Sequence, residues 1–364
     1  MVPRSGLVAI GLIAIAAAAL TGCTATASAS TTTNAVGGSA TSTRGAVEPL
    51  VLYAAEGYDA VMGKAFTAKT GIPVKVDDDS TGPLLTKIAA EKNNPQWSLL
   101  WVDGDTAFAS LDQQHELLDY TSTASWNTVG KAIVPADHSY FPTGTTVMAA
   151  LIYNAAKVSS VPKTYDDLTG AAYRDRLGMN EPSQSGPTYP FIAGLMNQLG
   201  GANKDIAAGQ AYFTTLKNNG LKVYPTNGDT LHALETGQIN YGLIQSSAAT
   251  GETIKVKPTA TYDPKIVYLS KSTLLPSVLG IDKGADAVQQ TEAKRFVDFA
   301  LSPEGQKVMQ TGDPSGDSLF WPVVDGVTPL KQLPAFPASY QRIDPVYWGP
   351  LQNKVVTWFD TNIK

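Results

Sequence analysis

Cysteine and histidine are both scarce in this 364-residue chain. Cys23 is the single cysteine, and only three histidines occur. One cysteine allows no intrachain disulfide and no cysteine-based metal site. His115, His138 and His232 lie far apart, without HExxH or any other metal-ligand spacing. The sequence therefore predicts neither a bound metal nor a cofactor.

Charged residues are also few. They make up 16% of the chain, with 27 Lys and Arg against 32 Asp and Glu, and the formal net charge is −5. No basic block typical of a nucleic-acid interface is present, so nucleic acid is not an expected partner. The sequence also has no Gly-x-Ser-x-Gly elbow, no Walker loop and no GxGxxG after a predicted strand. Nothing in these patterns favours an enzyme.

The first 23 residues carry the most specific signal. Arg4 precedes an uncharged stretch, residues 5–20, that is too short to span a bilayer comfortably. The tetrapeptide that follows, Leu20-Thr21-Gly22-Cys23, resembles the bacterial lipobox, in which the cysteine thiol receives diacylglycerol. We expect residues 1–22 to be a lipoprotein signal peptide and Cys23 to be the lipidation site. The protein would then work outside the cytoplasm, anchored to the cell membrane by lipid; a cleaved signal with a chance cysteine is the alternative.

The rest of the chain divides into a tether and a folded part. Residues 23–47 are mostly Thr, Ser, Ala and Gly, and such a segment buries too little surface to order itself, so we expect a flexible tether. From Glu48 onward, apolar runs at 50–53, 74–76 and 99–102 alternate with segments of helical periodicity. This order predicts an α/β fold with a parallel sheet and right-handed crossovers.

The second half repeats this organisation. An apolar run at 147–153 could pass between two lobes, and the chain length favours two lobes over one. A helix at 191–199 and a strand at 240–245 follow. Apolar segments at 266–269 and 274–281 could then carry the chain back to the first lobe.

Residues that follow the predicted strands are the site candidates, because ligands of open parallel sheets bind beyond the carboxyl ends of the strands. They come from both halves of the chain. The candidates are Glu56, Gly57, Ser80, Thr81, Gly82, Asp103, Ser183, Ser185, Gly186, Thr188, Asn227, Ser246 and Ser247.

Two of the candidate loops share a pattern. Residues 80–83, Ser-Thr-Gly-Pro, and residues 184–187, Gln-Ser-Gly-Pro, each place hydroxyls before Gly-Pro at a predicted helix start. Free N–H groups and the helix dipole favour an anion there, and hydroxyls can donate as well. One such loop in each lobe could clamp a phosphate, phosphonate or carboxylate. Ordinary helix capping is the alternative interpretation.

Acidic and aromatic residues also lie at the predicted strand ends. Glu56, Asp103 and Asp105 could receive a positive group such as an ammonium, or they could cap helices or face water. Three aromatic residues could stack on a ligand or belong to the core. These are Tyr53, Tyr58 and Trp101.

At this level of detail the chain resembles the type II periplasmic solute-binding proteins of ABC importers. The branch it resembles contains binders of iron(III), thiamine and 2-aminoethylphosphonate, and the likeness extends over roughly residues 48–345. The segments that carry it are LVLYAAEGYDAVMGKAFTAKTGIPV (50–74), DDSTGPLLTKIAAEKNNPQWSLLWVDGD (78–105), PKTYDDL (162–168), EPSQSGPTYPF (181–191) and RFVDFALSPEGQKVM (295–309).

The resemblance implies a two-lobe type II periplasmic-binding-protein-like fold with two crossover hinge segments and the ligand in the cleft between the lobes. Lobe 1 is expected to comprise residues 48–146 and 270–320, and lobe 2 residues 147–269 and 321–364. The implied partner is an ABC permease in the cytoplasmic membrane, and the implied oligomeric state is a monomer.

One departure from the family bears on the ligand. Iron(III) members carry adjacent tyrosines just after the strand that corresponds to residues 240–245, whereas this chain has Ser246 and Ser247 there. Serine is a poor ferric ligand but a good donor to the oxygens of an anion. We therefore expect a small anionic solute, with a phosphonate or phosphate ester favoured. Iron(III), thiamine or thiamine phosphate on the same scaffold, a secreted phosphate-ester hydrolase, and a ligand sensor for a membrane receptor are the alternatives.

Overall fold

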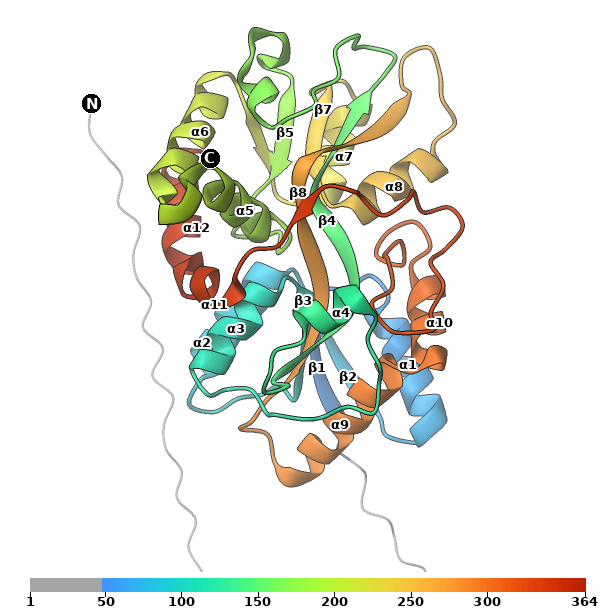
Figure 1. The fold of residues 1–364 in the computed structure, drawn as a ribbon. Helices are drawn as coiled ribbons and strands as arrows, with labels where there is room; N and C mark the ends of the chain where they lie inside the picture. Colours follow the sequence, from blue (N-terminus) through green and yellow to red (C-terminus); the bar gives the residue numbers. More distant parts are fainter. Residues whose placement is uncertain (1–47) are drawn as a thin grey trace, which may run out of the picture. The chain divides into compact units, whose positions relative to one another are not determined.

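The computed structural model describes residues 48–364, and the expected signal peptide, lipidated Cys23 and tether lie outside them. The described chain forms one sheet with the strand order β2-β1-β3-β8-β4-β7-β5-β6, and β9 pairs with β8 (Figure 1). The strands are β1 (Leu50–Ala54), β2 (Val74–Asp78), β3 (Leu99–Asp103), β4 (Tyr140–Asn154), β5 (Leu177–Asn180), β6 (Lys222–Tyr224), β7 (Tyr241–Ile244), β8 (Pro264–Ile281) and β9 (Tyr340–Gln341).

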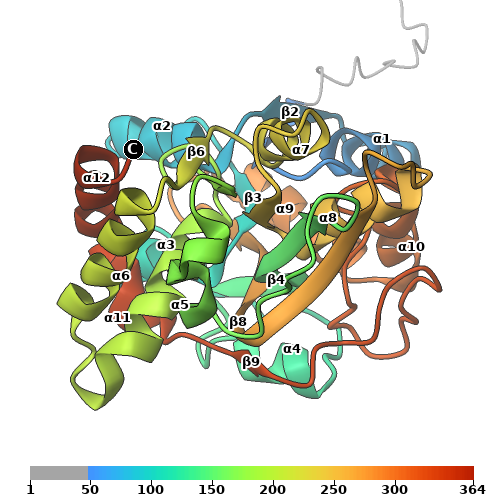
Figure 2. The ribbon, with the colours of Figure 1, turned by 90° about the horizontal axis from the view of Figure 1, so that it is seen from above.

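Helices cover the sheet on both sides and are short, as expected for a chain that alternates strand and helix. They are α1 (Asp59–Thr70), α2 (Thr81–Glu91), α3 (Asp105–Gln113), α4 (Thr128–Ile133), α5 (Thr188–Gly200), α6 (Ile206–Asn218), α7 (Asn227–Glu235), α8 (Ser246–Lys255), α9 (Ala287–Ala300), α10 (Pro303–Gly312), α11 (Pro345–Trp348) and α12 (Gln352–Asn362). The short 3₁₀ turns among residues 48–364 are η1 (Asp166–Thr169), η2 (Ala171–Tyr173), η3 (Gly201–Asn203) and η4 (Gly349–Leu351). Figure 2, seen from above, shows α5, α6 and α12 grouped on one side of the sheet and α8 on the other.

The sheet is mixed rather than wholly parallel. β1 pairs in parallel with β2 and β3, and β5 pairs in parallel with β6 and β7, as the alternation of strands and helices predicts. β8 and β4 lie between these two sets and run antiparallel to each other and to their outer neighbours. The expectation of a parallel sheet therefore holds within each lobe, and the two crossing strands reverse direction between them.

β4 and β8 are the two crossover segments. They have 15 and 18 residues, and they pair from Tyr140 opposite Gly280 to Asn154 opposite Pro264. The apolar segments at 266–269 and 274–281 thus belong to one long strand instead of two. The pairing register shifts twice along these strands, between Pro142 and Gly144 and between Met148 and Ala150. The expected two-lobe α/β fold with two crossovers is confirmed.

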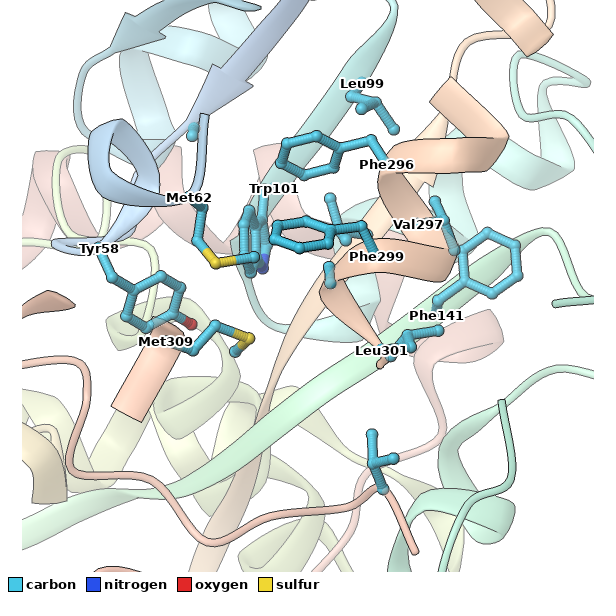
Figure 3. Packing of buried hydrophobic residues seen from close by; sticks show 14 of the residues in the cluster. Tyr58, Met62, Leu99, Trp101, Phe141, Phe296, Val297, Phe299, Leu301 and Met309 are labelled. Atoms are coloured by element: carbon cyan, nitrogen blue, oxygen red, sulfur yellow. The ribbon is translucent and has the colours of Figure 1, made fainter. Parts of the chain in front are cut away.

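Each lobe has its own buried core. In the first lobe, Trp101 is fully buried and its ring meets Phe296 edge-on at a centroid distance of 5.9 Å (Figure 3). Tyr58 packs on Trp101 at 5.2 Å, and its side chain is 1% exposed. Of the two interpretations offered for these aromatic residues, the structure supports the core. Tyr53 is also buried, with its hydroxyl donating to Glu91 at 3.1 Å.

The C-terminal part of the chain is divided between the lobes. Trp321 and Thr145 form an isolated antiparallel β-bridge, as do Val324 and Trp126. Apolar side chains of residues 321–336 pack with the core of the first lobe. Residues 343–363 pack with the core of the second lobe. The sequence predicted residue 321 onward to be part of lobe 2, whereas the apolar side chains of residues 321–336 lie with the first-lobe core. Within residues 48–364, no helix combines the length and apolarity that a membrane span requires.

Candidate functional site

The two hydroxyl-bearing loops that the sequence paired meet at the junction between the lobes. Gly82, in the first turn of α2, directs its N–H at the carbonyl oxygen of Gln184 at 3.4 Å. A Cβ added at Gly82 would lie 2.0 Å from the carbonyl oxygen of Ser183, and one added at Gly186 would lie 2.2 Å from Thr81 Oγ1. The N-terminus of α2 and the loop before α5 therefore touch across the junction.

Several hydroxyls at this end of the junction are free to donate. Ser80 precedes α2, but its side chain makes no capping hydrogen bond. Ser185 Oγ accepts from Asn180 Nδ2 at 3.1 Å, which leaves its own proton available. Thr188 is fully buried at the start of α5, and its Oγ1 has no hydrogen-bond partner within residues 48–364. Ser183 differs, because its hydroxyl donates to Glu181 at 2.6 Å.

An amide network links the lobes at the centre of the junction. Gln245 Nε2, at the end of β7, donates to Asp103 Oδ2 at 2.9 Å and to Thr146 Oγ1 at 3.3 Å. Asn227 Nδ2 donates to Gln245 Oε1 at 3.4 Å, and Asn227 Oδ1 accepts from Asn180 at 2.6 Å. Asp103 of the first lobe is thus connected to the N-termini of α7 and α8 in the second.

Carboxylates gather from the centre of the junction, at Asp103, toward its other end. Glu56 accepts from Ser277 Oγ at 2.6 Å. Asp317 accepts from the Gly57 N–H at 2.9 Å and from Ser247 Oγ at 3.4 Å. None of the ion pairs among residues 48–364 includes Glu56, Asp103 or Asp317. We call these three side chains the acidic group.

The pKa values of the acidic group reflect burial without a counter-ion. Burial raises the pKa of Glu56 well above its usual value, and the nearby charges of Asp103 and Asp317 raise it further. Burial and then the charge of Asp317 raise the pKa of Asp103. Burial raises the pKa of Asp317 from the ordinary 3.8 to about 6, with a smaller contribution from Asp313. A neighbouring cation would stabilise the ionised form of these carboxyl groups, which lack a counter-ion in the protein.

Other candidate residues have structural partners within the protein. Ser246 Oγ accepts from the backbone N–H of Val147 at 3.1 Å and so ties α8 to β4. Asp105 begins α3 and interacts with Arg342 rather than with the acidic group, and burial raises its pKa to about 6. The run at 77–79 lies at the edge of the sheet, where Asp77 pairs with Lys87. Among the described residues, no group of His, Cys, Asp and Glu side chains is arranged to hold a metal ion.

Asp317 and Gln245 were missed by the sequence analysis. Asp317 follows a helix, α10, and reaches the junction through the turn 313–317, in which Asp313 accepts from the Asp317 N–H at 2.7 Å. Gln245 was counted within its strand. The sequence signal available for Asp317 is the Gly and Asp content of residues 313–317, which is typical of a turn.

A groove adjoins the junction at its hydroxyl-bearing end. It has a volume of about 450 Å³, within the range of small-molecule pockets. It runs along α2 and α3 and is closed on the second-lobe side by η4 and α12, and Gly82 and Ser183 form part of its lining.

Comparison with known proteins identifies the family. Residues 62–338 match the family described as bacterial extracellular solute-binding protein. The chain belongs to this family. Proposed 2-aminoethylphosphonate-binding periplasmic proteins of Salmonella paratyphi A and Salmonella typhimurium are 26% and 27% identical to this solute-binding protein over 275 residues, 74% of each chain.

Solved structures share the fold of this solute-binding protein. AfuA from Actinobacillus pleuropneumoniae, with fructose-6-phosphate bound, has a TM-score of 0.73 at 20% identity and covers 86% of this chain and 98% of its own. Iron-bound HitA from Pseudomonas aeruginosa has a TM-score of 0.70 at 21% identity and covers 86% and 99%. A periplasmic thiamin-binding protein has a TM-score of 0.67 at 16% identity and covers 86% and 96%. The resemblance to the type II periplasmic-binding-protein branch is confirmed, and these scaffolds carry chemically different solutes.

Proposed function

We propose that this solute-binding protein captures a small solute that carries a phosphonate or phosphate-ester group together with an ammonium group. The solute binds at the lobe junction and is delivered to an ABC permease. The protein is held at the outer side of the cytoplasmic membrane by lipid on Cys23. It acts as a monomer and performs no catalysis.

The observation that carries this proposal is the polarity of the junction. At one end, Ser185 and Thr188 keep hydroxyl protons free to donate, beside the N-termini of α2 and α5. Such groups favour the oxygens of an anion. At the other end, the acidic group has no counter-ion, with Glu56 and Asp103 buried and Asp317 half-buried, and it favours a cation. A zwitterion satisfies both ends at once.

The relatives support the same class of solute. 2-Aminoethylphosphonate, named for the proposed Salmonella binding proteins, has a phosphonate and a primary amine separated by two carbons. Ser246 and Ser247 stand where iron(III) binders carry tyrosines, and Ser247 donates to Asp317. This arrangement favours an organic solute over ferric ion.

Closure of the two lobes would retain the bound solute. The lobes touch through Gln245 and Asp103, and through Ser247 and Asp317. A solute that contacts both lobes only when they are closed shifts the open–closed equilibrium toward the closed form. The permease would then recognise the closed, loaded protein.

The test is calorimetry of the purified protein with a matched set of solutes. We expect 2-aminoethylphosphonate to bind and ethylphosphonate, which lacks the amine, to bind at least about tenfold more weakly, because a charge-assisted hydrogen bond contributes about 1.5–3 kcal/mol. Binding of ferric citrate or thiamine with no response to either phosphonate would contradict the proposal. A phosphate ester incubated with the protein should be recovered intact by phosphorus NMR, and its hydrolysis would indicate the secreted-hydrolase alternative.

The anchor has its own test. We expect the full chain produced in a bacterial host to fractionate with membranes and to incorporate labelled fatty acid. Cys23→Ser should release it to the soluble extracytoplasmic fraction. Equal labelling of the two forms would contradict lipidation at Cys23.

A further inference from the structure

Glycines hold the two lobes in backbone contact at opposite ends of the junction. Gly82 on α2 faces the carbonyl oxygen of Ser183, and a Cβ at Gly82 would lie 2.0 Å from it. Gly251 on α8 faces the carbonyl oxygen of Ser315, and a Cβ there would lie 1.8 Å from it. Figure 1 shows α2 and α8 on opposite sides of the crossing strands. Each contact joins one lobe to the other.

The backbone conformation does not account for these glycines. Neither Gly82 nor Gly251 has a positive φ angle. Gly82 is the second residue of α2, and Gly251 lies in the interior of α8. Alanine is the better helix former at such positions, because glycine loses more backbone entropy on folding. The requirement for glycine therefore comes from the approach of the opposite lobe.

We propose that Gly82 and Gly251 are positioning residues for solute capture, and that they set how closely the lobes approach and hence how small the enclosed solute must be. This inference rests on the proposed function, in which closure retains the solute. The atoms that a Cβ would meet belong to the backbone, so they cannot swing aside as a flexible side chain could. A methyl group at either position must keep the lobes apart at that end.

The consequence is a strain confined to the closed form. In the open form the lobes separate, and alanine at position 82 or 251 meets no carbonyl oxygen. We expect Gly82→Ala and Gly251→Ala to leave the unfolding temperature of the ligand-free protein unchanged or raised. Affinity for 2-aminoethylphosphonate should fall at least tenfold, mainly through faster dissociation, because the closed form is the one that retains the solute. Damage to a lobe would instead lower stability and affinity together.

A matched control is available on α7. Gly228 is the second residue of that helix, as Gly82 is of α2, and a Cβ at Gly228 would meet only Thr226 Oγ1 at 3.6 Å. Gly228→Ala should therefore keep the wild-type affinity and lobe separation. A loss in this variant equal to that in Gly82→Ala would overturn the inference, since helix position alone would then explain it.

The lobe separation is measured directly with two spin labels. Lys255→Cys on α8 and Lys307→Cys on α10 place exposed labels on different lobes, in a full chain whose native thiol is removed by Cys23→Ser. With saturating 2-aminoethylphosphonate, the wild type should show one short distance, and Gly251→Ala should show a longer one. Identical distances and affinities in wild type and variants would refute the role of the glycines.

The two proposals fail in different ways. If the wild type binds no phosphonate, the proposed solute is wrong, and the ligand-free samples still test the glycines. In those samples the short-distance population seen in the wild type should be depleted in Gly251→Ala. An undiminished population there would count against the glycine contact whatever the solute.

Discussion

Replacing Asp317 by asparagine should stabilise the ligand-free protein and lower its affinity for a solute that carries an amine. Asparagine keeps the oxygen that accepts from Gly57 but cannot ionise beside Glu56 and Asp103. Burial raises the pKa of Asp317 from 3.8 to about 6, so the folded protein holds this proton more strongly than the unfolded chain does. Ionisation therefore costs folding free energy as the pH rises through this window, and the full cost is present above about pH 6.

The magnitude follows from that window. Each pKa unit corresponds to about 1.4 kcal/mol, and Asp317 keeps partial contact with solvent, so we expect Asp317→Asn to raise the free energy of unfolding by about 1–2 kcal/mol at pH 7.5. The unfolding temperature should rise by ~2–4 °C. Near pH 4 the wild-type side chain is protonated in the folded state, and most of the difference should disappear. Calorimetric unfolding at both pH values measures it.

The same variant should lose affinity selectively. A missing charge-assisted contact should weaken 2-aminoethylphosphonate binding by about tenfold or more, whereas ethylphosphonate, which has no amine, should bind as it does to the wild type. Asp325→Asn, at an exposed turn, changes the net charge equally and serves as the control. Lower stability at pH 7.5, or an equal loss for both phosphonates, would refute the reasoning about the acidic group.

Three further predictions use other parts of the structure. Affinity for 2-aminoethylphosphonate should fall as the pH drops from 7.5 to 5, because Asp317, with a pKa of about 6, takes up a proton. Calorimetric titrations at several pH values measure this. An affinity that does not change with pH would argue against an ammonium partner for Asp317. The double variant Ser185→Ala, Ser246→Ala should bind 2-aminoethylphosphonate more than tenfold more weakly by calorimetry. Each of the two hydroxyls accepts a hydrogen bond from the protein and keeps a proton to donate to the solute. A folded double variant with wild-type affinity would exclude these hydroxyls as donors to the solute. Phe296→Ala should lower the free energy of unfolding by about 3–5 kcal/mol in urea, because its ring fills the core beside Trp101, and a loss under 1 kcal/mol would contradict that packing.

The sequence predicted the parts of the junction that follow strands. The loops containing Ser80 and Ser185 meet in the structure because strand–helix alternation directs every strand end of a lobe toward the same edge. Glu56 and Asp103 come close for the same reason, since β1 and β3 are neighbours. The order of strands and helices along the chain was therefore sufficient to predict that these residues lie close together.

The remaining features depend on contacts between distant segments. Asp317 reaches the junction only because α10 packs on α1 and its following turn lies under α8, as the Gly251–Ser315 approach shows. The antiparallel course of β4 and β8 depends on how the chain returns between lobes, which periodicity does not encode. The placement of residues 321–336 on the first lobe likewise depends on which apolar surface of β4 was left to cover.

The central claim is that a zwitterion lies across the junction with its anionic end toward α5 and its cationic end toward the acidic group. A crystal structure of the protein grown with 2-aminoethylphosphonate tests it most directly. We predict phosphonate oxygens within hydrogen-bond distance of Ser185 and Thr188, and the ammonium within the same distance of at least two carboxylates among Glu56, Asp103 and Asp317. A solute in the reverse orientation, or one confined to the groove between α2 and α12, would contradict the account.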